Sequence, residues 1–166
     1  MNEIINRLVK IEESYKSFIR NGFVCEIERM MGTGLLAGKI YLPKTHPLYA
    51  QYIDESYINV YSSFLEFYYY EDYKVVSFVC DKPSGKITPH YFEPYRTFRP
   101  KVNEYNFTIK DIEAYGYKSM SYMEKELDRL SYAFLLSYSG VIDDNLIKSL
   151  EEKSSQFLAK FLLTKV

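Results

Sequence analysis

The sequence predicts an α+β fold with an N-terminal helix, a four-stranded and mostly antiparallel sheet, and two C-terminal helices. Three observations lead to this class. Apolar residues recur at helical spacing near both ends of the chain. The central part is rich in β-branched and aromatic residues, which favour strands. Two of the connections between these strand-like segments, residues 32–34 and 71–72, are short enough to be hairpin turns.

The first expected element is a helix over residues 2–20. Apolar side chains recur there at helical spacing, from Ile4 to Ile19. Asn21-Gly22 follows and is interpreted as the stop signal of this helix.

Two strands are expected next, over residues 23–31 and 35–42. Gly32-Thr33-Gly34 lies between them and permits the positive φ angles of a tight turn. Gly38 interrupts the second strand, which indicates a bulge or a close backbone approach.

The most strand-like segment comes later, over residues 57–70 and 73–80. It consists of two aromatic and β-branched runs joined by Glu71-Asp72, which suits a hairpin. Residues 86–107 then contain three prolines and show no clear period. A long irregular loop is expected there, and such loops are often functional.

From residue 108 the pattern is helical again. Thr108 resembles the capped start of a short turn, and residues 119–138 carry the apolar face of one helix. Asp143 or Asp144 then caps a last helix. Residues 141–166 are apolar enough to dock firmly on the domain or to form a homodimer.

Length and charge limit the class of function. At 166 residues, one domain spanning residues 1–166 is the default. The formal net charge is −1, whereas a DNA mimic would be strongly acidic and a general nucleic-acid binder strongly basic. No stretch approaches the roughly 20 apolar residues of a membrane helix, and no signal peptide is recognised. A cytoplasmic location without a membrane partner is therefore expected.

Candidate catalytic and metal-binding residues are few. The two histidines, His46 and His90, and the two cysteines, Cys25 and Cys80, lie too far apart in sequence to form a zinc motif. Both cysteines are interpreted as buried thiols, and a disulfide is expected only if their strands pair closely. A nucleophilic pair of Cys80 with either histidine is conceivable. We nevertheless expect no catalysis, no metal and no cofactor.

Residues 82–110 are the strongest local anomaly. They contain six basic and six aromatic residues but only two acidic ones. Basic groups beside aromatic rings suit phosphate contact and base stacking. The same composition also fits a long loop that uses its rings as anchors and its charges for solubility.

Three motifs resemble a family of small bacteriophage and prophage proteins. Residues 21–27, NGFVCEI, resemble its N-G-[YF]-V-C-x-I opening. Residues 38–49, GKIYLPKTHPLY, resemble its G-[YF]-[VI]-x-[LIV]-P-x-x-H-P-L-[YF] core, of which H-P-L-Y is the most specific part. Residues 117–130 resemble its entry into a Glu/Lys-rich helix. The similarity covers roughly residues 20–135.

Two polar elements of that family are degenerate in this chain. Residues 60–65, VYSSFL, stand where relatives have V-H-G-G-[LI]-T, and residues 74–82, KVVSFVCDK, stand where they have W-[WF]-x-G-F-D-x-[AG]-H. Of that polar set only His46 remains. The resemblance therefore implies binding rather than catalysis, and it carries over no activity.

These observations lead to a first hypothesis. The protein would be a non-catalytic, phage- or mobile-element-encoded inhibitor of a bacterial defence system, of the anti-CRISPR or another anti-defence kind. It would bind a host protein or ribonucleoprotein in the bacterial cytoplasm, and this step rests on analogy. The expected binding residues combine aromatic rings with basic groups: Tyr91, Tyr95, Arg96, Phe98, Arg99, Lys101, His46, Tyr68 and Tyr70.

Two alternatives stay open. The first is a nucleotide-binding protein, either a sponge for a signalling nucleotide or a weak phosphoesterase, that uses residues 82–110. His46 or His90 would then contact phosphate, and a tyrosine would stack on the base. The second is a homodimeric structural protein that associates through its last helix.

Overall fold

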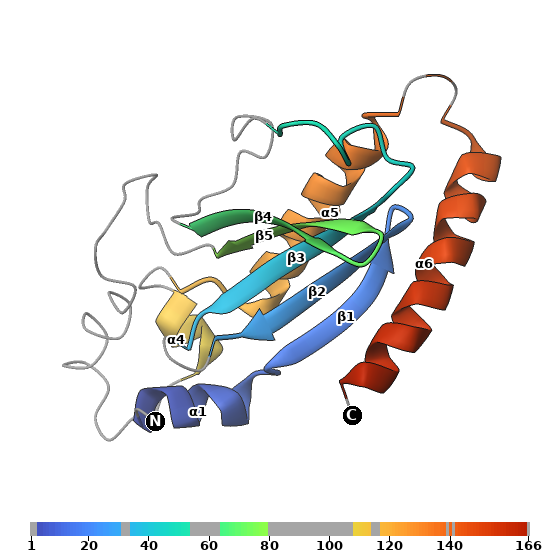
Figure 1. The fold of residues 1–166 in the computed structure, drawn as a ribbon. Helices are drawn as coiled ribbons and strands as arrows, with labels where there is room; N and C mark the ends of the chain where they lie inside the picture. The colour runs from blue at the N-terminus through green and yellow to red at the C-terminus, as the bar shows by residue number, and fades with distance from the viewer. Residues whose placement is uncertain are drawn as a thin grey trace.

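A computed structural model describes residues 3–30, 34–53, 64–79, 108–113, 117–138, 140 and 142–165. In the described part of the chain, helices lie on both sides of one sheet, as Figure 1 shows. In chain order the described elements are α1 (Glu3–Ile11), β1 (Tyr15–Arg20), β2 (Phe23–Arg29), β3 (Leu36–Pro43), β4 (Phe64–Tyr70), β5 (Tyr73–Val79), α4 (Ile109–Glu113), α5 (Met120–Leu135) and α6 (Asp144–Thr164). The predicted α+β class is confirmed.

The sheet has five strands rather than the predicted four, because the first predicted helix is too long. Only Glu3–Ile11 is helical, and Tyr15–Arg20 forms the edge strand β1. Asn21-Gly22 is not a helix stop but a two-residue hairpin turn, in which both residues have positive φ (53° and 87°). A turn of that geometry matches the twist of paired strands, so β1 runs back along β2.

All neighbouring strands are antiparallel, in the order β1-β2-β3-β5-β4. The second predicted hairpin is confirmed, since Tyr70 pairs with Tyr73 across Glu71-Asp72. The β2–β3 turn also follows the prediction at Gly34, which has a φ of 77° and donates its N–H to the Met30 carbonyl. The predicted strand residues 57–63 and Cys80, and the predicted loop over 86–107, lie outside the described residues.

The first face of the sheet packs on α5, which lies behind the sheet in Figure 1. Strand residues such as Cys25, Ile40 and Phe78 meet the apolar stripe of α5, which includes Met123 and Leu127. These side chains are fully buried. Burying large apolar side chains supplies about 1.5–3 kcal/mol each, so this interface is the main core.

Gly38 on β3 allows α5 to approach the sheet closely. A Cβ atom at this position would lie 2.7 Å from Phe78 Cζ and 3.1 Å from Met123 Cε. The pairing of β3 with β2 and β5 is continuous through Gly38. The predicted bulge is therefore wrong, and the atoms that lie close to Gly38 belong to side chains rather than to another backbone.

The last helix reaches both faces of the sheet. Leu150 belongs to the main core, whereas Phe157 and Phe161 pack on the second face against Tyr41 and its neighbours. Between these points the Ser154 hydroxyl donates to the carbonyl of Gly22, at 2.6 Å. The α6 helix thus passes the β1–β2 turn, and docking is the role that the structure assigns to it.

The caps of the last two long helices follow from local chemistry. The Ser119 hydroxyl accepts from the Tyr122 N–H at the start of α5, and the Asp143 carboxylate accepts from the Leu146 N–H at the start of α6. The short helix α4 begins after Thr108, whose hydroxyl accepts from the Asp111 N–H. All three starts agree with the predicted ones.

Candidate functional site

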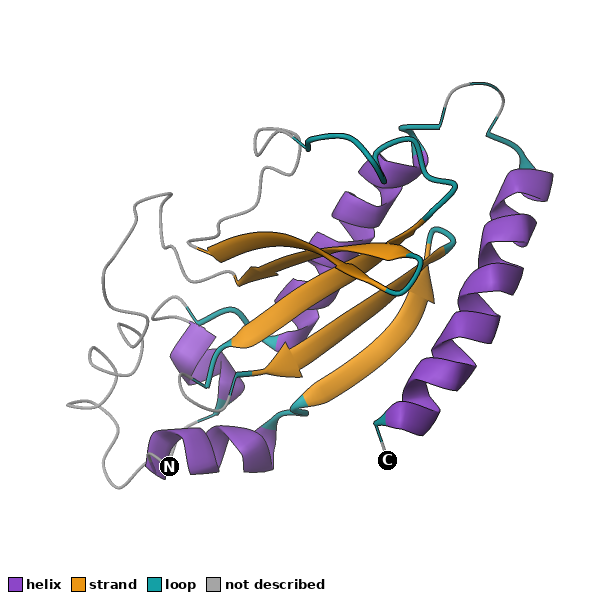
Figure 2. Cartoon of the chain, in the orientation of Figure 1, coloured by secondary structure: helices purple, strands orange, loops and turns teal. Residues whose placement is uncertain are grey.

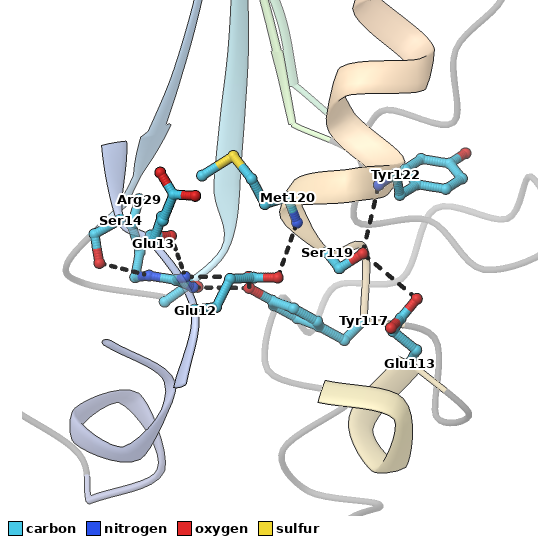
Figure 3. Close-up of polar contacts among 10 residues, drawn as sticks. Glu12, Glu13, Ser14, Arg29, Glu113, Tyr117, Ser119, Met120 and Tyr122 are labelled. Carbon is cyan, nitrogen blue, oxygen red and sulfur yellow. Dashed lines mark hydrogen bonds and ion pairs between the residues drawn. The ribbon is translucent and has the colours of Figure 1, made fainter. Parts of the chain in front are cut away.

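A buried polar network joins the N-terminal segment to α5, as Figure 3 shows. The Arg29 guanidinium pairs with the Glu12 carboxylate at 3.2 Å, and both side chains are almost completely buried. Glu12 also accepts from the Tyr117 hydroxyl at 2.6 Å and from the Met120 N–H at 3.0 Å. The carboxylate therefore satisfies a backbone donor at the start of α5.

Every N–H group of Arg29 has an acceptor inside the protein. The side chain donates to the Ser14 hydroxyl, the Tyr117 hydroxyl, the Glu12 carboxylate, and the carbonyls of Glu13 and Gly34. A guanidinium has five such donors, so none is left for a ligand. We interpret the network as structural.

His46 also has a structural role. It is only 3% exposed, its Nε2 lies 2.8 Å from the Phe134 carbonyl, and its Nδ1 accepts from the Leu48 N–H at 3.0 Å. An accepting Nδ1 leaves the proton on Nε2, which donates to Phe134. Both ring nitrogens are occupied, so the structure offers neither to phosphate, and His46 is not part of the site proposed below.

The stability of the protein is expected to depend on the protonation of His46. Burial, the largest effect, lowers the pKa of His46 below its ordinary value, and the Lys74 ammonium lowers it further. The neutral ring is thus favoured in the folded state, whereas the unfolded chain takes up a proton as the pH falls below about 6.5. The free energy of unfolding should therefore fall with pH in that range.

Urea unfolding from about pH 7.5 to about pH 5.5 checks this expectation. The His46→Gln variant keeps a donor toward Phe134 but has no titrating ring, so its urea midpoint should fall less than that of the wild type. His90 is present in both proteins, and the difference between them isolates His46. Parallel pH profiles would contradict the expectation.

Cys25 is a free thiol in the main core. Burial raises its pKa to about 12, so the thiolate that a nucleophile requires is not formed at neutral pH. Strand β3 lies between β2, which carries Cys25, and β5, which ends at Val79, so β2 and β5 do not pair with each other. Cys80 and His90, the other members of the predicted thiol and histidine pairs, lie outside the described residues.

The second face of the sheet carries a row of polar residues across all five strands. Strand pairing aligns them in the order Ser17, Glu26, Lys39, Ser77 and Glu66. Cross-strand neighbours on one face have Cβ atoms about 4.5–5.5 Å apart, so these side chains form a continuous polar row. Figure 2 shows that the described helices leave the middle of the sheet uncovered on this side.

Glu26, the second residue of the row, is fully buried. Its carboxylate accepts from the hydroxyls of Tyr15 at 2.7 Å and Tyr41 at 3.0 Å. Lys39 Nζ lies 3.7 Å from it and Lys165 Nζ, at the end of α6, lies 3.5 Å from it. Burial and the nearby Glu26 raise the pKa of Tyr41, so both tyrosines stay protonated donors.

Lys39 is shared between two carboxylates. Its Nζ also lies 3.6 Å from Glu28. Burial alone would lower the pKa of Lys39, but Glu26, Tyr68 and Glu28 together raise it. The lysine therefore stays charged, and its charge is already balanced by its neighbours.

A cavity of about 430 Å³ lies beside this row. Arg29, Met30 and Phe78 line part of it, and the rest of its lining belongs to the second face: Glu28, Ala37, Lys39, Glu66, Ser77 and Val79. This volume is within the range of about 300–1,000 Å³ found for ligand sites. We take the polar row together with this cavity as the candidate site, and call it the open face.

The predicted binding residues other than His46 fall in three places. Tyr68 lies on the second face beside Lys39 and is 36% exposed. Tyr70 packs edge-on against Phe161 and Tyr41, at the part of this face that α6 covers. Tyr91, Tyr95, Arg96, Phe98, Arg99 and Lys101 lie outside the described residues, so the structure does not bring them to this face or exclude them from it.

No motif in the sequence predicted that Glu26, Lys39, Glu66 and Ser77 belong to one site. The alternation of apolar and polar residues in β2 does predict that Glu26 and Glu28 lie on the same face of the sheet. The alignment of Lys39, Ser77 and Glu66 depends on the insertion of β5 between β3 and β4. No local sequence pattern predicts that β5 lies between β3 and β4.

No protein-family model, curated protein or solved structure matches the chain. Among the described residues, no three His, Cys, Asp or Glu side chains are arranged to hold a metal ion. None of the described helices combines the length and the apolar character that a membrane span requires.

Proposed function

We propose that the protein is a non-catalytic binding protein that engages a macromolecular partner through the open face. The observation that carries this proposal is a sheet face on which α6 covers only one part, while the rest presents a polar row and a cavity. Partner sites commonly combine such a hollow with aromatic and charged groups at its border. Tyr68 supplies an exposed ring at that border.

The class of partner comes from the sequence. The three motifs that resemble those of bacteriophage and prophage proteins favour a target in the bacterial cytoplasm. By analogy with small phage-encoded antagonists, the target is a defence complex, protein or ribonucleoprotein, and the protein inhibits it by binding.

The nucleotide-binding alternative receives less support from the described residues. Two carboxylates line the cavity, Glu28 and Glu66, and they would repel a phosphate. Two cations, Arg29 and Lys39, also line it, and both are already paired with carboxylates. A nucleotide site at the basic aromatic residues 82–110 stays a separate prediction, because most of that segment lies outside the described residues.

A pulldown with tagged protein from a bacterial lysate expressing defence complexes tests the proposal. We expect a stoichiometric protein or ribonucleoprotein to be captured. A nucleotide as the sole co-purifying species, with no macromolecule, would contradict the proposal and favour the alternative.

A charge-reversed variant of the predicted loop separates the two candidate surfaces. In the Arg96→Glu, Arg99→Glu and Lys101→Glu triple variant, capture should persist if the open face is the main contact. Complete loss of capture, with an unchanged melting temperature, would instead assign the contact to the loop.

A further inference from the structure

We propose that the cavity on the open face binds a single arginine side chain of the partner protein, with Glu66 as its carboxylate. This inference rests on the proposed function and specifies what the open face recognises. Three features carry it: the charge that is left unbalanced, the donor and acceptor pattern beside Glu66, and the apolar floor.

The charge balance on this face leaves Glu66 unneutralised. Lys39 is held between Glu26 and Glu28, at 3.7 and 3.6 Å. Glu66 lies two strands away from Lys39, a separation of about 10 Å at the usual strand spacing. Among the described residues Glu66 has no ion-pair partner. Its carboxylate is therefore able to pair with a cation of the ligand.

The neighbouring residue supplies a second acceptor. Ser77 pairs directly with Glu66 across β5 and β4, and both side chains line the cavity. Their Cβ atoms are about 4.5–5.5 Å apart in such a pair. A guanidinium presents planar, forked donors that can reach a carboxylate and an adjacent hydroxyl together, whereas an ammonium is a point charge.

The apolar part of the cavity suits the stem of the same side chain. Ala37 and Val79 lie opposite each other on β3 and β5, on the second face, and Met30 lies beside them at the end of β2. Arginine carries three methylene groups that are commonly buried against such surfaces while the head group stays polar. The cavity volume of about 430 Å³ is ample for one side chain.

An NMR titration of the ¹⁵N-labelled protein tests the inference without a known partner. The probe is Nα-acetyl-arginine amide, and the control ligand is Nα-acetyl-citrulline amide, which has nearly the same shape but no charge. We expect arginine-dependent shifts concentrated at residues 37, 66, 77 and 79, and affinity for the citrulline probe at least about tenfold weaker. The Glu66→Gln variant should lose about the same factor toward arginine, whereas Glu152→Gln on the exposed side of α6 should bind it as the wild type does.

Three results would overturn the inference: equal binding of both probes, arginine shifts scattered over the whole surface, or shifts at the cavity residues with inorganic phosphate but not with arginine. The pulldown is independent of this titration. A captured partner together with a silent titration would reject the arginine site and keep the proposed function. A positive titration with no partner captured would keep the site and reject the function.

Discussion

Replacing Arg29 with methionine is expected to lower the free energy of unfolding by about 3–5 kcal/mol, because it leaves the buried Glu12 carboxylate without its cation. The loss includes the guanidinium hydrogen bonds to the Gly34 and Glu13 carbonyls, which would then be buried without that donor. Urea unfolding followed by circular dichroism measures the change. Arg29 is therefore expected to be among the positions least tolerant of substitution.

Arg129→Met is the matched control. Arg129 pairs with Glu126 on the exposed side of α5, at 3.1 Å, and pairs of this kind contribute only about 0.3–0.5 kcal/mol. A double variant, Arg29→Met with Glu12→Gln, should be less destabilised than the sum of the single variants, because the uncompensated charge is gone. Additive effects, or equal losses for Arg29→Met and Arg129→Met, would refute the buried ion pair.

Replacing Gly38 with valine is expected to cost about 1–3 kcal/mol by overpacking the interface between the sheet and α5. The new Cβ would lie 2.7 Å from the Phe78 ring, inside a fully buried core. Thermal or urea unfolding measures the loss. Because the clash is with the far end of that ring, a second substitution, Phe78→Leu, should recover part of the stability of Gly38→Val.

Ala37→Val is the control for the Gly38 variant. Ala37 is the preceding residue of the same strand, but it lines the cavity on the opposite face. Its extra methyl groups have space there, and valine suits a strand, so we expect a change within about 0.5 kcal/mol. If the two valine variants were equally destabilised, the cause would be the strand itself rather than the close approach of α5.

Much of the fold could be predicted from local sequence signals. The hairpin at Glu71-Asp72 and the caps at Ser119 and Asp143 each depend on residues near one another in the chain. The error at residues 15–20 arose because Tyr15, Phe18 and Ile19 satisfy a helical period, while their β-branched and aromatic character and the following Asn21-Gly22 favour a hairpin. Asn21 and Gly22 form a hairpin turn with positive φ angles, so residues 15–20 are a strand and not a helix.

The candidate site was harder to predict because it depends on strand order. Glu26, Lys39 and Glu66 come from three separate strands, and Lys165 reaches Glu26 from the end of the last helix. His46 stood out in the sequence as the one residue that remains of the polar set expected from the resemblance. Its contacts with Phe134 and Leu48 give it a structural role that no motif states.

The central claim is that the partner binds to the open face, and one substitution there tests it most directly. Ser77→Arg places a long cationic side chain in the cavity, beside Glu66, while Ser155→Arg makes the same change on the exposed side of α6. In a quantitative pulldown, Ser77→Arg should reduce the captured partner at least about tenfold, since it fills the site and its charge occupies Glu66. Ser155→Arg should capture as much as the wild type. Undiminished capture by a folded Ser77→Arg variant would contradict the claim and exclude the open face as the binding surface.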